Sequence, residues 1–222
     1  MKWIRLSIAG LSLLAGLSPA LAMPPDFVRL SEVAPGVWQD MRYAGDNNFT
    51  GRPVAGYDAP ACWLKTMAAR ALAGVEAGAE AQGLRLIVWD CFRPQRATVA
   101  LLNWTLDAKD QTMKERFYPR IAKHDLVRLG YIARASAHST GFAVDVGLLR
   151  ANGDLLDFGG EFDLFDPRST TASFLVSATA RTNRARLAGL MSARGFRNYT
   201  GEWWHFALPR EHAPAFDAPI EP

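Results

Sequence analysis

Two side chains that could bind a metal ion lie close together in the middle of this 222-residue chain. His138 and Asp145 are separated by six residues, among them Gly141, which permits a turn between them. A neutral imidazole nitrogen and a carboxylate oxygen are both good ligands for a zinc-like cation. Asp145 lies in an alternating stretch that predicts an interior strand, and a carboxylate is rarely buried unless it is paired or bound to a cation. The segment therefore favours a metal site over a purely structural role for Asp145.

A second candidate segment, residues 201–206, contains Glu202 and His205. His205 would supply a third protein ligand and leave a fourth position for water, as in catalytic rather than structural zinc sites. Alternation over residues 204–208 predicts a strand, on which Glu202 and His205 would point to opposite sides unless Glu202 lies on the preceding turn. A free carboxylate on that turn could act as a general base. The spacing of His138 and Asp145 is by itself only weakly specific.

Arg93 follows a buried strand directly and precedes Pro94, which begins a predicted helix. A guanidinium at such a junction can serve as a fixed donor fork aimed at an oxyanion. It can equally form a surface or structural salt bridge, and position alone favours this second interpretation.

Hydrophobic periodicity predicts the elements that must position these side chains. Helices are expected where apolar residues recur every three or four positions, with Gly83 and Gly195 as C-terminal stops. Strands are expected in the short apolar or alternating runs. The predicted helices are residues 60–82, 95–106 and 183–194, and the predicted strands are residues 84–89, 143–148 and 204–208. We expect an α+β fold with a central, mostly antiparallel sheet, helices packed against it and the metal site in a cleft on the sheet.

The N-terminus has the pattern of a secretory signal peptide: basic Lys2 and Arg5, an apolar run over residues 6–17, and a small-x-small cleavage pattern at residues 20–22. We therefore expect residues 1–22 to be a leader, although an uncleaved membrane anchor is the alternative. Residues 23–222 are long enough for one domain with a sizeable core. The mature protein is expected to be exported, to the periplasm or beyond the cell, without stable membrane insertion. Its formal charge of +3 falls by two with the leader, and no basic stripe indicates nucleic-acid binding.

Cys62 and Cys91 are the two cysteines of the chain. In an oxidising compartment they could form one disulfide, tying the front of a helix to the end of a neighbouring strand. Two separately buried thiols are the alternative, because sequence cannot supply the bridging geometry.

Five separated motifs give the chain a family resemblance. S-x-H-x-x-G-x-A-x-D at residues 136–145 and E-x-W-H at residues 202–205 resemble the signature of the VanX-like zinc D-alanyl-D-alanine dipeptidases of peptidase family M15. The wider group also contains zinc DD-carboxypeptidases. Three further segments match in the same order, so the resemblance spans nearly the whole chain after the leader: residues 42–44 with 48–51, residues 89–90 with 93–94, and residues 162–163 with Asp166, Arg168 and Ser169.

The resemblance implies a role for each matching residue. His138, Asp145 and His205 would bind one Zn²⁺ per chain, Glu202 would be the catalytic base, and Arg93 would stabilise the transition state. Asp163 would receive the free amine of the substrate, and other residues would line the dipeptide pocket: Ser136, Tyr43 and, with a weaker match, Tyr57.

The expected function is therefore hydrolysis of the small dipeptide D-alanyl-D-alanine, derived from cell-wall peptidoglycan, by a zinc-bound water assisted by a glutamate base. One alternative is a zinc DD- or LD-carboxypeptidase that trims peptidoglycan stem peptides. The other is a non-catalytic wall-binding relative, against which the presence of both Glu202 and Arg93 argues.

Overall fold

A five-stranded mixed sheet forms the centre of the fold in the computed structural model, which describes residues 23–221. The leader expected at residues 1–22 lies outside the described residues. Across the sheet the strands run in the order β2 (Trp38–Gln39), β4 (Leu84–Asp90), β5 (Ala143–Arg150), β7 (His205–Ala207) and β6 (Arg197–Asn198). Only β2 and β4 are parallel, so the sheet is mostly antiparallel, as predicted. A second, two-stranded antiparallel sheet pairs β1 (Phe27–Arg29) with β3 (Trp63–Lys65).

The two long central strands are buried because helices and loops cover both faces of the sheet. In β4 every residue from Leu86 to Asp90 is buried, and in β5 every residue from Ala143 to Leu149 is buried. Gly147 makes this packing possible, because a Cβ at this position would lie 2.5 Å from the ring of Trp89. The near-continuous apolar runs in the sequence therefore correspond to strands with no solvent-facing side.

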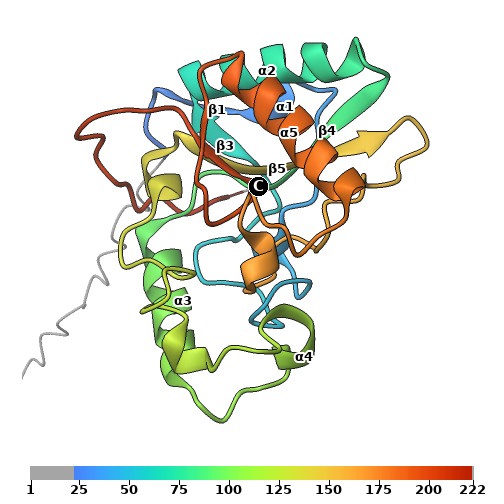
Figure 1. The fold of residues 1–222 in the computed structure, drawn as a ribbon. Helices are drawn as coiled ribbons and strands as arrows, with labels where there is room; N and C mark the ends of the chain where they lie inside the picture. The colour runs from blue at the N-terminus through green and yellow to red at the C-terminus, as the bar shows by residue number, and fades with distance from the viewer. Residues whose placement is uncertain (1–22, 222) are drawn as a thin grey trace, which may run out of the picture.

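Figure 1 shows the longer helices on two sides of the sheet. α2 (Thr66–Glu80) and α5 (Ala178–Ser192) lie together on one side, and α3 (Gln95–Leu106) and the short α4 (Lys114–Phe117) lie on the other. Another short helix, α1 (Leu30–Val33), follows β1 directly. Four 3₁₀ turns complete the fold: η1 (Arg42–Ala44), η2 (Lys123–Asp125), η3 (Ala137–Thr140) and η4 (Pro167–Ser169). None of the helices among the described residues is long and apolar enough to cross a membrane.

Two predicted helices have different starts in the structure. The first begins at Thr66 rather than at residue 60, because residues 63–65 pair with β1 as strand β3. Leu64 fits the spacing of apolar residues in the helix, but its pairing with β1 makes it part of a strand instead. The last helix begins at Ala178, where the Ser177 hydroxyl accepts a hydrogen bond from the Ala180 N–H. A serine N-cap stabilises this start.

Cys62 and Cys91 form a disulfide with a Cα–Cα distance of 5.4 Å. Cys62 immediately precedes β3 and not a helix, which corrects the position expected from the sequence. The bridge therefore links the start of β3 to the end of β4, and so joins the small sheet to the central one.

Candidate metal centre and active site

Three neighbouring strands bring acidic and imidazole side chains together at one end of the sheet. Asp145 of β5 is paired with Asp90 of β4 on one side and with His205 of β7 on the other. Asp90 is the last residue of its strand and His205 is the first residue of its own. Antiparallel pairing thus places two distant residues next to Asp145: Asp90, which is 55 positions before it, and His205, which is 60 positions after it.

His138 reaches the same place from the turn η3, just before β5. The hydroxyl of Ser136 caps this turn by accepting a hydrogen bond from the His138 N–H at 3.2 Å. Gly141 ends the turn with a φ of 77°, and its N–H donates to the carbonyl of His138. A Cβ at Gly141 would lie 2.3 Å from the ring of Phe27, so both backbone conformation and space require glycine here.

The donor atoms of His138, Asp145 and His205 converge on one point. Nε2 of His138 lies 3.0 Å from Nδ1 of His205 and 3.3 Å from Oδ1 of Asp145. Nδ1 of His205 and Oδ1 of Asp145 are 3.0 Å apart. Ligands at zinc–nitrogen and zinc–oxygen distances of about 2.0–2.2 Å in a tetrahedron lie roughly 3.3 Å from one another. The spacing and the donor types therefore fit a zinc ion. Within residues 23–221 this is the one group of three His, Cys, Asp or Glu side chains with that convergence.

The tautomer of His138 is set by a carbonyl group. Its Nδ1 lies 2.7 Å from the backbone oxygen of Cys91, which can only accept a hydrogen bond. Nδ1 therefore carries the proton, and Nε2 presents its lone pair to the metal site. Although burial opposes the ionised form of Asp145, the imidazoles of His138 and His205 outweigh it and lower the pKa of this carboxyl below its ordinary value. Asp145 thus offers an anionic oxygen to a metal ion.

Asp90 organises the layer behind the ligands. It is fully buried and accepts hydrogen bonds from the Tyr57 hydroxyl at 2.6 Å and from Nε and Nη2 of Arg93 at 3.0 and 2.7 Å. Its Oδ2 also lies 3.4 Å from Nδ1 of His138. Sequence reasoning assigned Asp90 no role of its own; the signal available was an aspartate at the end of an apolar strand, directly before the Arg93–Pro94 pair.

Glu202 lies on the turn before β7, as its proposed catalytic role requires. Its Oε2 is 4.0 Å from Nδ1 of His205, and its carboxylate accepts no hydrogen bond from any described residue. Burial raises the pKa of Glu202 well above its ordinary value, and the nearby carboxylates of Asp145 and Asp163 raise it further. A carboxylate with a raised pKa and free lone pairs is a stronger proton acceptor than an exposed glutamate.

Arg93 forms a structural ion pair and also lines the cavity. Two of its nitrogens bind Asp90, while its guanidinium carbon lies 5.0 Å from the centre of the Tyr43 ring. Nη1 donates no hydrogen bond to any described residue, and the side chain lines the cavity at the metal site. Burial opposes the charged form, but Asp90 holds the pKa of Arg93 above its ordinary value. The structural ion pair therefore leaves one fixed donor available to a ligand.

Asp163 faces the same cavity from the loop after β5. Its backbone has a φ of 62°, a left-handed conformation unusual for a residue other than glycine. The Tyr43 hydroxyl donates a hydrogen bond to its Oδ2 at 2.7 Å. Burial, reinforced by Asp145, raises the pKa of Asp163 to about 8. A cationic group would restore the ionised form of this carboxyl.

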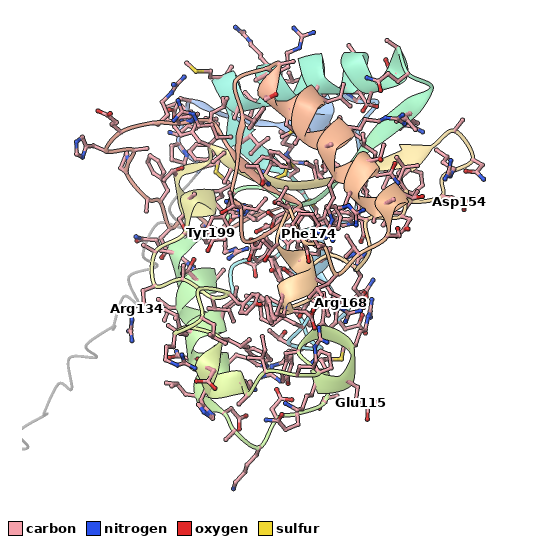
Figure 2. All side chains as sticks on the ribbon, in the orientation of Figure 1. Glu115, Arg134, Asp154, Arg168, Phe174 and Tyr199 are labelled. Atoms are coloured by element: carbon pink, nitrogen blue, oxygen red, sulfur yellow. A yellow bond between two sulfur atoms is a disulfide. The ribbon has the colours of Figure 1, made fainter. Side chains whose placement is uncertain are left out.

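The structure brings all the predicted site residues except one to the cavity surface. Tyr57 is the exception: it is buried and does not line the cavity, and its hydroxyl donates a hydrogen bond to Asp90. Tyr199 was not predicted but lines the cavity with its ring edge-to-face against His205, at 6.0 Å between centres (labelled in Figure 2). The volume of the cavity is about 260 Å³, below the roughly 300–1,000 Å³ of pockets for drug-sized ligands, so a small substrate is expected.

Comparisons with known proteins agree with this geometry. A family model described as D-ala-D-ala dipeptidase matches residues 23–220. A D-alanyl-D-alanine dipeptidase of Enterococcus faecium is 37% identical over 88% of this chain and 98% of its own length. The proteins of that name from Streptomyces coelicolor and Escherichia coli are 38% and 31% identical, over 89% and 83% of this chain and 100% and 86% of their own lengths.

A solved LD-carboxypeptidase structure is a weaker match. It is 16% identical, and the match covers 86% of this chain and 71% of that one with a TM-score of 0.46, which is too low to support an argument.

Proposed function

Because the chain belongs to the D-Ala-D-Ala dipeptidase family, we propose that it is an exported, zinc-dependent peptidase that hydrolyses the dipeptide D-alanyl-D-alanine. The convergence of His138, Asp145 and His205 beside the free carboxylate of Glu202 is the observation on which this proposal rests. These three residues would hold the zinc ion, which would supply Lewis-acid chemistry for acidifying water and polarising a carbonyl group.

Charge balance in the cavity supports both a metal ion and a substrate with a free ammonium group. Asp145, Asp163 and Glu202 line the cavity without an ion pair to lysine or arginine, because Arg93 is engaged with Asp90. Buried carboxylates require compensating charge. One divalent cation and one ammonium group together balance the three, so the site suits a peptide with a free amino terminus.

In the proposed reaction, Glu202 accepts the proton of the attacking water and then delivers it to the leaving amine. Its raised pKa suits the first step, because it makes the carboxylate a stronger proton acceptor than an exposed glutamate. Arg93 directs Nη1 at the oxygen on which negative charge develops, an effect worth roughly 3–4 kcal/mol for one well-placed donor.

Asp163 would select the length of the substrate. Its carboxylate, oriented by Tyr43, pairs with the ammonium group of a dipeptide. An acylated or longer peptide has no charge there and would leave the carboxyl buried without a partner, which discriminates strongly.

The test is a substrate panel: D-Ala-D-Ala, L-Ala-L-Ala and N-acetyl-D-Ala-D-Ala, each with and without a chelator. We expect rapid, chelator-sensitive cleavage of D-Ala-D-Ala and negligible cleavage of the acetylated peptide. Cleavage of an acylated stem peptide that persists in Asp163→Ala would instead identify a carboxypeptidase. Absence of all hydrolysis by the zinc-loaded mature protein would favour a wall-binding relative.

A further inference from the structure

Cys91 connects the disulfide to the metal site through its backbone. Its sulfur is bonded to Cys62, its N–H donates to Oδ1 of Asp90 at 2.9 Å, and its carbonyl accepts the Nδ1 proton of His138 at 2.7 Å. The group that sets the tautomer of a proposed zinc ligand therefore belongs to a disulfide-bonded residue.

The segment that carries Cys91 is also held by its neighbours: the Arg93 N–H donates to the His138 carbonyl at 3.3 Å, and the buried ring of Phe92 lies 5.0 Å from that of Phe27. The last paired residues of β4 and β5 are Asp90 and Asp145, so Cys91 lies just beyond the strand pairing. The neighbouring Phe92 N–H donates to the carbonyl of Trp63, the residue that follows Cys62. The disulfide and this hydrogen bond link the end of β4 to β3 of the small sheet.

The Cys62 end is firmly held. Its carbonyl accepts a hydrogen bond from the Leu30 N–H at 2.9 Å, and its N–H donates to the Gln39 side chain at 3.3 Å. Both cysteines are buried, at 1% and 0% exposure. Movement of the Cys91 carbonyl is therefore limited by an anchor in a different sheet.

We propose that the Cys62–Cys91 disulfide is a positioning device for the metal site: it fixes the Cys91 carbonyl on Nδ1 of His138 and so raises affinity for zinc. This inference rests on the proposed zinc-dependent function. Partners that orient a ligating histidine typically change metal affinity 10–100-fold when they are lost. In this chain the partner is the Cys91 carbonyl, and a disulfide holds it in place. The oxidising compartment expected from the leader would allow this disulfide to form.

The test measures zinc affinity, by competition with a chelating dye, in the mature protein and in the double variant Cys62→Ala/Cys91→Ala. We expect the variant to bind zinc roughly 10-fold or more weakly. ¹⁵N-histidine spectra of the metal-free proteins provide a second readout: the Nδ1–H form of His138 should dominate in the wild type and be mixed with the other tautomer in the variant.

Leu86→Ala is the matched control, because it removes buried packing from the other half of β4 and also destabilises the fold. It should keep wild-type zinc affinity. If the double variant does not fold, Cys62→Ala/Cys91→Val, which fills more of the space left by the sulfur atoms, gives the same measurements.

Zinc affinity and tautomer equal to those of Leu86→Ala would overturn the inference and leave the proposed function intact. Failure of the wild type itself to bind zinc would reject the proposed function instead.

Discussion

Glu202 differs from the other carboxylates of the site because it has no hydrogen-bond donor among the described residues. Asp90 accepts four hydrogen bonds, and Asp163 accepts one from Tyr43. The lone pairs of Glu202 therefore remain free for a water molecule in the cavity. This difference separates the proposed base from residues that hold the site together.

Replacing Glu202 with glutamine should lower kcat on D-Ala-D-Ala by about 10²–10⁴-fold, the usual contribution of general acid–base catalysis. Zinc content should not change, because Glu202 is not among the converging donors. Steady-state kinetics and metal analysis check this. Glu161→Gln, which alters an exposed carboxylate paired with Arg116, is the control and should retain full activity. Activity of Glu202→Gln within a few-fold of wild type would exclude the assigned role.

Asp163 should make the metal-free protein less stable as pH rises. Its pKa of about 8 in the folded state exceeds the value of about 3.9 in an unfolded chain, so the folded state holds the proton over this range. The stability this proton provides is present below about pH 4 and is lost as pH rises through about 8.

Asp163→Asn removes this titration, and asparagine tolerates the left-handed backbone found here. Thermal unfolding with chelator from pH 5 to 9 should therefore show a smaller decline of Tm in the variant than in the wild type. Parallel pH profiles would contradict the assigned burial of Asp163.

At the scale of elements, sequence periodicity predicted α3 and β4 nearly to the residue, because each is a long, clearly patterned segment. It misplaced the start of α2, since the pairing of β3 with β1 depends on residues about 36 positions apart. It did not identify β2 and β6, which have two residues each and are strands only through their partners. Local pattern cannot reveal such long-range pairings.

The turn η3 is the element on which the position of His138 depends. Gly141→Ala should lower stability by about 2–4 kcal/mol, from left-handed backbone strain and from contact with Phe27, and should weaken zinc binding. For a chain of this size the loss corresponds to a fall in Tm of roughly 5–15 °C.

Gly153→Ala is the matched control, because Gly153 also has a positive φ of 89° but nothing lies within 4 Å of its Cβ position. It should lose only the backbone contribution, about 1 kcal/mol, and keep wild-type zinc affinity. Equal effects of the two substitutions on zinc affinity would show that η3 does not position His138.

At the scale of the whole molecule, motif resemblance located the site better than it located the supports behind it. His138, Asp145, Glu202 and His205 were proposed from residue type, and the family resemblance implied their roles. The roles of Asp90 and Tyr57 could not be predicted, because they arise from a hydrogen bond between segments 33 positions apart in the sequence. The role of a residue that acts through a distant partner cannot be predicted from the local sequence pattern.

Export remains a proposal for the intact chain. Expression of the full-length chain in a Gram-negative host should yield a periplasmic protein that begins at Met23, as mass spectrometry of the purified product would show. An intact N-terminus at Met1 in the cytoplasmic fraction would contradict the expected leader at residues 1–22.

The central claim is that three side chains from η3, β5 and β7 hold one zinc ion. The most direct test is a crystal of the zinc-loaded mature protein measured on both sides of the zinc absorption edge. We expect one anomalous peak within about 2.0–2.2 Å of Nε2 of His138, Oδ1 of Asp145 and Nδ1 of His205. No peak there, or a peak bound by other residues, would contradict the account.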